Sequence, residues 1–300
     1  MSVIRIKQLT KAFAPNKGIF DVSFTINRGE VFGFLGPNGA GKTTTIRHLM
    51  GFIKPQYGQA SIMELDCWSQ QRQIQRYLGY LPAEIAFPEN MTGIQLISYV
   101  AKMRKQGSLA KAEALIHRFQ LDPSGKIDRM SKGMKQKIGI VCAFMHDPEV
   151  LILDEPTSGL DPLMQSAFVS LLQEEKRKGA SILLSSHVFE EIEVTCDRLG
   201  IIKQGRIVSM LGANELRQTA ERSYTIELVD AAGLTDLEEA GFKCEDRDDA
   251  TRSIVVHIDD GQINELLRVL SRHTVQSFRE HQAFVGQHFI GLYKGENTDV

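Results

Sequence analysis

The sequence has few cysteines, no excess of basic residues and no long hydrophobic run. Its 4 cysteines in 300 residues are scattered without the spacing of a metal site, which is typical of a protein kept in a reducing compartment. The longest apolar run, residues 138–145, is much shorter than a membrane-spanning helix requires. Because Arg5 and Lys7 interrupt the only apolar stretch near the N-terminus, we expect neither a signal peptide nor a membrane segment.

The overall composition is that of a folded protein with balanced charge. The 35 basic and 37 acidic residues give a formal net charge of −2, so we expect no basic face and no nucleic-acid partner. A hydrophobic content of 42% is sufficient for a core and argues against a disordered chain. The length accommodates two domains, which we place at residues 1–216 and 217–300.

A glycine-rich loop follows the apolar run 31–35 and precedes a predicted helix. Such a loop lets successive N–H groups point at an anion, and the start of the helix adds the positive end of its dipole. Lys42 would reach the β- and γ-phosphates of a nucleotide, and the Thr43 hydroxyl would bind Mg²⁺. The sequence therefore predicts a phosphate-binding loop made of Gly36, Pro37, Asn38, Gly39, Ala40, Gly41, Lys42, Thr43 and Thr44.

Three more polar residues follow apolar runs that are typical of buried parallel strands. Asp154 and Glu155 follow residues 150–153, and His187 follows residues 182–186. Ligands bind at the carboxyl ends of such strands, so we expect these side chains to meet the loop there. We predict that Asp154 holds Mg²⁺, that Glu155 polarises the attacking water, and that His187 lies beside the γ-phosphate as a third catalytic group with Glu155 and Lys42.

A helix start lies ahead of the acidic pair at residues 130–137, whose sequence is MSKGMKQK. Ser131 is a predicted N-cap, and its hydroxyl with the free N–H groups of the helix would form a second anion site. On these residues alone an ordinary capped helix is the better interpretation, and only the whole set of motifs in order favours the anion site. These residues resemble the signature motif of ATP-binding cassette (ABC) ATPases. Over about the first 215 residues the chain is similar to that family, with Phe13 in the segment that places an aromatic ring against adenine and residues 158–161 in the D-loop.

The resemblance implies a dimer in which two cassettes sandwich two ATP molecules. Each ATP would lie between the phosphate loop of one subunit and Ser131 and Gly133 of the other. Two positions depart from the family pattern. Lys132 stands where the family has glycine, and its charge is expected either to attract the partner's γ-phosphate or to point to solvent. Ala83 stands where the family has a glutamine, and Glu84 is a candidate to replace that glutamine as a metal ligand.

The expected fold is an α/β P-loop NTPase (ABC ATPase) core with an antiparallel β flank and a helical insertion. Flank strands are predicted at residues 3–6, 22–26 and 59–63, and helical spacing of apolar residues places the insertion at about 84–135. Through the resemblance, the insertion would form a groove for a cytoplasmic helix of a membrane partner. Phe87 and Met91 are the apolar candidates for that groove, and packing inside the insertion is an equally good interpretation.

After residue 216 the pattern indicates a small α+β domain. Strands are predicted at residues 223–229 and 252–257, helices at 234–240 and 262–272, and a last strand within 283–293. This order suggests a ferredoxin-like unit. An acidic group is predicted to be a solvated turn rather than a calcium site, because its ligand spacing is irregular; it comprises Glu245, Asp246, Asp248 and Asp249.

The hypothesis that follows is an ATP-binding and ATP-hydrolysing subunit of an ABC transporter. Similar appendages on exporter ATPases favour export by analogy. Its partners would be ATP with Mg²⁺, a second ABC subunit, and a separate transmembrane permease that keeps the chain cytoplasmic and peripheral at the inner face of the cell membrane. The alternative is a low-turnover regulatory subunit of a heterodimeric ABC complex, slowed by Lys132 and Ala83.

Overall fold

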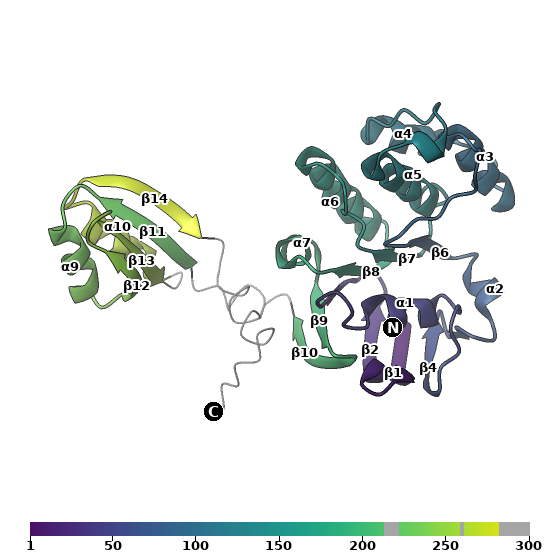
Figure 1. Cartoon of the computed structure of the whole chain (residues 1–300), viewed down its shortest axis with the longest axis horizontal. Helices are drawn as coiled ribbons and strands as arrows, with labels where there is room; N and C mark the ends of the chain where they lie inside the picture. The colour runs from purple at the N-terminus through teal and green to yellow at the C-terminus, as the bar shows by residue number, and fades with distance from the viewer. Residues whose placement is uncertain (213–221, 259–260, 282–300) are drawn as a thin grey trace. The chain divides into compact units, whose positions relative to one another are not determined.

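The computed structural model describes residues 1–212, 222–258 and 261–281. The chain divides into two compact units, Met1–Ala213 and Asn214–Val300, which are drawn in Figure 1. The boundary expected at residue 216 falls in the stretch outside the described residues.

A six-stranded sheet forms the centre of the first unit, in the order β10-β9-β3-β8-β7-β6. The strands from β9 to β6 are parallel, and β10 closes one edge as an antiparallel hairpin with β9. The central strands lack polar alternation because both of their faces are buried. Their bounds are β3 Val31–Leu35, β6 Leu78–Leu81, β7 Val150–Asp154, β8 Ser181–Ser186, β9 Arg198–Lys203 and β10 Arg206–Gly212.

A second, antiparallel sheet has the order β2-β1-β4-β5. Phe24 of β2 stacks on Phe32 of β3 with ring centroids 4.9 Å apart, so the two sheets share one core. In the antiparallel sheet, β1 and β2 are longer than the pattern predicted. Register shifts in their pairing let both strands continue through polar residues. The strands are β1 Ser2–Ala14, β2 Lys17–Asn27, β4 Tyr57–Ile62 and β5 Leu65–Asp66.

Helices cover the six-stranded sheet, with α3, α4 and α5 gathered on one side of it in Figure 1. α3 starts in the capping box that Thr92 and Gln95 form, and α6 starts at Asp161, whose carboxylate accepts from the Met164 N–H. The predicted helical insertion is confirmed. The helices are α1 Lys42–Leu49, α2 Gln71–Ile74, α3 Gly93–Met103, α4 Ala110–Arg118, a 3₁₀ turn Ile127–Arg129, α5 Lys132–Phe144, α6 Pro162–Arg177 and α7 Phe189–Thr195.

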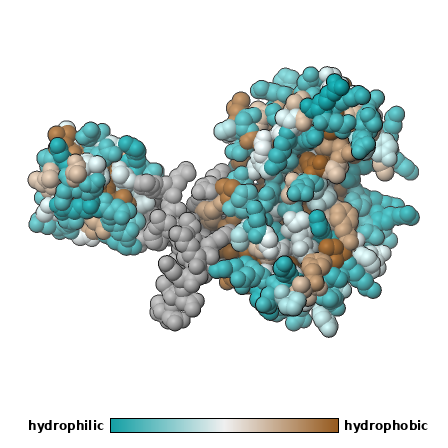
Figure 2. All heavy atoms as spheres, viewed as in Figure 1, coloured by the Kyte–Doolittle hydropathy of each residue, from teal (hydrophilic) through white to brown (hydrophobic). Residues whose placement is uncertain are grey.

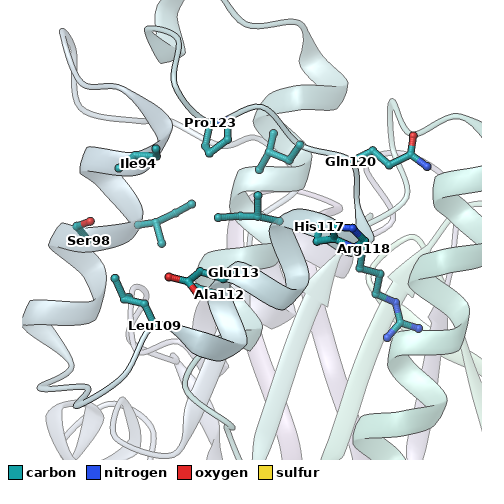
Figure 3. A pocket seen from close by; sticks show the side chains of 12 residues that line it. Ile94, Ser98, Leu109, Ala112, Glu113, His117, Arg118, Gln120 and Pro123 are labelled. Carbon is teal, nitrogen blue, oxygen red and sulfur yellow. The ribbon is translucent and has the colours of Figure 1, made fainter.

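The insertion contains a pocket of about 970 Å³ between α3 and α4. Figure 3 shows Ile94 and Ser98 on one side of this pocket and Leu109 and Glu113 on the other. Phe87 and Met91 are half-buried and do not line the pocket. The groove predicted at those two residues therefore does not coincide with the pocket.

The surface that Figure 2 shows is mainly hydrophilic, with hydrophobic side chains in small separate groups. Of the helices in the described residues, none combines the length and the apolar character that crossing a bilayer takes.

The second unit has the element order of a ferredoxin-like fold, βαββαβ, and its antiparallel sheet runs β12-β13-β11-β14. The sequence-based prediction missed β12 and assigned its acidic residues to a turn, which was wrong for Glu245, Asp246 and Asp248. Charged residues are common on edge strands such as β12 because they prevent further strand pairing. The elements are β11 Arg222–Leu228, α9 Ala232–Glu239, β12 Lys243–Asp248, β13 Ser253–Ile258, α10 Ile263–Leu270 and β14 Val275–His281.

The last predicted strand, within residues 283–293, lies outside the described residues, and the fourth strand of this sheet is β14 instead. The described residues hold no group of three or more His, Cys, Asp or Glu that could bind a metal ion.

Candidate functional site

The predicted phosphate loop joins the end of β3 to the start of α1. Gly41 immediately precedes the helix with φ of 114°, and a Cβ at this position would lie 2.8 Å from Cγ2 of Ile19. Only glycine fits there. The first N–H groups of α1 have no carbonyl partner within the helix, so this end of the helix favours a negative charge.

Lys42 is the buried cation of the loop. Its side chain is 5% exposed, and Nζ donates to the carbonyl oxygens of Gly36 at 2.5 Å and Pro37 at 3.2 Å. Nζ also lies 3.7 Å from Oε1 of Glu155. Burial lowers the pKa of Lys42, while the negative charge of Glu155 opposes that effect. The loop thus holds a partly compensated ammonium group at the place where the sequence predicts phosphates.

Asp154, at the end of β7, is fully buried and hydrogen-bonded by two hydroxyls. The Thr43 hydroxyl donates to Oδ2 at 2.9 Å, and the Ser185 hydroxyl donates to Oδ1. Burial raises the pKa of Asp154, and the two hydroxyl donors oppose this effect. A carboxylate and a hydroxyl at this distance are hard oxygen donors of the kind Mg²⁺ takes, together with phosphate oxygens and water. Thr43 and Asp154 therefore fit a magnesium ion.

Glu155 and His187 meet above the ends of β7 and β8. Nδ1 of His187 lies 3.3 Å from Oε1 of Glu155, the same oxygen that faces Lys42. Glu155 has φ of 48°, a left-handed conformation that is uncommon for a residue with a side chain and is often found at functional sites. His187 is 49% exposed. The structure thus brings the three predicted catalytic side chains together.

Glu191 on α7 is a residue that the sequence analysis missed. Its Oε1 accepts from the Thr157 hydroxyl at 2.6 Å, and its Oε2 accepts from the Ser186 hydroxyl at 2.8 Å. Thr157 follows Glu155 by two positions and Ser186 directly precedes His187. One carboxylate therefore fixes the two segments that carry the Glu155–His187 pair.

The predicted N-cap at Ser131 is present, because its hydroxyl accepts from the Met134 N–H at 3.2 Å at the start of α5. Gly133 lies so close to the D-loop that a Cβ there would be 2.5 Å from the carbonyl oxygen of Gly159. Lys132 was expected either to attract the partner's γ-phosphate or to point to solvent, and the structure shows a third contact. Its side chain is exposed, but Nζ donates to the Ser158 hydroxyl at 2.7 Å.

Phe13 and Glu84 are the predicted ligands that the structure does not bring to the centre of the site. Phe13 lies near the end of β1 and is 59% exposed, so its contact with adenine stays a prediction. Glu84 is exposed beyond β6 and, among the described residues, forms no hydrogen bond or ion pair with Thr43 or Asp154. Its role as a metal ligand also stays a prediction.

Comparisons with known sequences agree on one family. The ABC transporter family model matches residues 19–158. The probable multidrug ABC transporter ATP-binding protein YbhF of Escherichia coli is 33% identical over 221 residues, which are 72% of this chain and 38% of YbhF. The chain thus spans well under half the length of that relative. The bacitracin transport ATP-binding protein BcrA of Bacillus licheniformis is 32% identical over 88% of this chain and 89% of its own length.

Solved structures give the same result. The ATP-binding subunit of an ABC transporter superposes with a TM-score of 0.66 at 35% identity, over 72% of this chain and 92% of that one. The dimeric cassette MJ0796 superposes with a TM-score of 0.64 over 70% of this chain and 98% of its own, and at 19% identity it supports the fold alone.

Proposed function

This chain belongs to the ATP-binding proteins of ABC transporters, and from that premise we propose that it hydrolyses ATP as one half of a dimer and thereby drives a separate transmembrane permease. The ATP-binding role follows from the family, whose members include ATPases. The finer parts of the proposal are turnover by this chain, the assignment of its residues, its dimer, and export as the direction of transport.

One observation carries the proposal. At the carboxyl edge of the sheet, Lys42 and His187 contact the same oxygen of Glu155. Thr43 contacts Asp154, which directly precedes Glu155. These contacts bring together a lysine suited to phosphate, a carboxylate that can serve as base, and a pair of oxygen donors suited to a metal. Phosphoryl transfer to water requires these groups at one place.

The residues would divide the chemistry as follows. The backbone N–H groups of residues 38–44 and the Lys42 ammonium would hold the β- and γ-phosphates and neutralise the charge that develops during transfer. Mg²⁺ bound at Thr43 and Asp154 would supply Lewis-acid polarisation of the phosphate oxygens. Glu155 would orient and deprotonate the attacking water, and His187 would hold the carboxylate in position.

The second half-site supports a dimer. Ser131 and the free N–H groups at the start of α5 would complete the site of a partner subunit, together with Gly133. The cassette shares its fold with MJ0796, whose solved structure is described as dimeric; the dimer proposed here rests on the half-site at Ser131 and Gly133.

Export through a separate permease is the remaining part of the proposal. Two relatives carry names that refer to multidrug and bacitracin transport, which supports an exporter. The helical insertion would contact the permease, and the chain would then be cytoplasmic and peripheral at the inner face of the membrane.

The test is ATP turnover by the purified full chain as a function of protein concentration. We expect turnover per chain to rise as dimers form, and Glu155→Gln to bind ATP while losing turnover by about 100-fold or more. Glu239→Gln, an exposed glutamate in the second unit, is the matched control and should behave as wild type. Light scattering with ATP should show Glu155→Gln as a dimer.

Two results would overturn the proposal. One is turnover that is unchanged by dilution in a strictly monomeric preparation, and the other is equal turnover in Glu155→Gln. Binding of ATP with very low turnover in the wild type would instead favour the low-turnover regulatory subunit.

A further inference from the structure

The start of α5 is attached to the turn that follows Glu155 at three points. The Lys132 ammonium donates to the Ser158 hydroxyl at 2.7 Å. Gly133 packs against the carbonyl of Gly159. One turn further along α5, buried Gln136 donates from Nε2 to the carbonyl oxygen of Pro156 at 2.7 Å.

The turn itself is short and internally hydrogen-bonded. The Ser158 N–H donates to the Glu155 carbonyl at 3.2 Å, and the Leu160 N–H donates to the Thr157 carbonyl at 3.0 Å. A displacement of Ser158 is therefore transmitted directly to the backbone of Glu155, which already has a left-handed conformation.

Lys132 is well suited to hold this turn. Its aliphatic stem packs on the D-loop, since a Cβ at Gly159 would lie 3.2 Å from Cγ of Lys132. The amine then reaches across Gly159 to Ser158. A glycine at position 132, as in the usual family pattern, has no side chain with which to make either contact.

We propose that Lys132 is a positioning residue that sets the rate of hydrolysis by holding Ser158, and through it Glu155, rather than by contacting the nucleotide. The inference rests on the proposed ATPase function. It assigns to the unusual signature lysine a task within its own subunit. The same contact would join the half-site at Ser131, which faces a partner's nucleotide, to the carboxylate that acts on the subunit's own nucleotide.

The experiment is a double-mutant cycle on the full chain, with Lys132→Met and Ser158→Ala. Each single variant should lower kcat about threefold, the value expected for loss of one charge-assisted hydrogen bond at an exposed position, with KM for ATP unchanged. The double variant should also lose about threefold rather than ninefold, because both changes remove the same contact. Lys132→Arg should restore most of the rate, and Lys102→Met, an exposed lysine on α3, should have no effect.

Amide hydrogen exchange provides a second readout that does not depend on activity. Without nucleotide, Lys132→Met and Ser158→Ala should both speed exchange at the Leu160 amide, whereas Lys102→Met should not. Additive losses of rate, a raised KM for ATP, or unchanged exchange would each overturn the inference. If the wild-type chain shows no turnover, the proposed function fails, and the exchange measurement alone decides whether Lys132 holds the turn.

Discussion

His146 predicts a specific acid sensitivity of the cassette. It follows Met145, the C-cap of α5, and its Nε2 lies 3.2 Å from the carbonyl oxygen of Leu78 on β6. The same carbonyl accepts from Arg104, which follows α3, at 3.0 Å. Burial, and next the positive charge of Arg104, lower the pKa of His146 to about 4. This histidine is therefore neutral at the junction where the insertion meets the sheet.

The sign and size of the effect follow from proton linkage. In the unfolded chain His146 takes up a proton near its ordinary pKa of 6.5, whereas in the folded chain it does so only near 4. His146 does not lower the free energy of unfolding well above pH 6.5. It lowers this free energy as the pH falls from 6.5 to 4, because the unfolded state binds the extra proton first. At pH 5 the loss in free energy of unfolding amounts to about 2 kcal/mol, and below pH 4 to about 3 kcal/mol.

Urea unfolding at pH 7.5 and pH 5 tests this prediction. Trp68 is the single tryptophan of the chain and is 41% exposed in the cassette, so its fluorescence reports on that unit. We expect wild type to lose about 2 kcal/mol more than His146→Gln between the two pH values, since glutamine does not titrate. The exposed His117→Gln should keep the wild-type difference. Equal losses in wild type and His146→Gln would refute the reasoning.

Other predictions concern the site itself. Ser185→Ala removes a donor from buried Asp154, so we expect the cassette to lose about 1–3 kcal/mol of stability in urea unfolding. A metal titration should show that this variant needs more Mg²⁺ for half-maximal turnover. An unchanged titration would contradict the assigned metal role. Glu191→Gln keeps the size of the side chain, but only one of its two end groups can still accept a hydrogen bond. We expect kcat to fall about tenfold with little change in KM. A change in KM alone would contradict a positioning role. Gly133→Ala places a methyl group against the Gly159 carbonyl, and we expect it to lower the stability of the cassette by about 1–3 kcal/mol. Light scattering should also show weaker ATP-driven dimerisation. Dimerisation equal to that of wild type would contradict the tight contact.

Much of the cassette could be predicted because its signals are local. The strand at 150–154 has no polar alternation and is buried on both faces, and Thr92 and Ser131 begin helices through their own side chains. The parallel order of β3, β7 and β8 then brings the residues at their ends together. For this reason the meeting of Lys42, Glu155 and His187 could be predicted from three separated segments.

The features that were missed depend on neighbours that are remote in the sequence. β12 shows no hydrophobic pattern because it is an edge strand, so its pairing with β13 becomes visible only in the sheet. Glu191 belongs to a helix whose sequence gives no sign that its carboxylate reaches Thr157 across 34 positions. The partner of Lys132 is 26 positions away, and a lysine is ordinarily expected in solvent.

These contacts make α5 the connection between the parts of the cassette. Its first turn is capped by Ser131, and Gln136 holds the backbone beyond Glu155. Beyond its last turn, His146 meets the Leu78 carbonyl, which Arg104 joins to α3 of the insertion. Packed interiors transmit displacement rather than absorb it. A displacement of the insertion is therefore expected to shift Ser131 and the Glu155 turn together, because both are attached to α5.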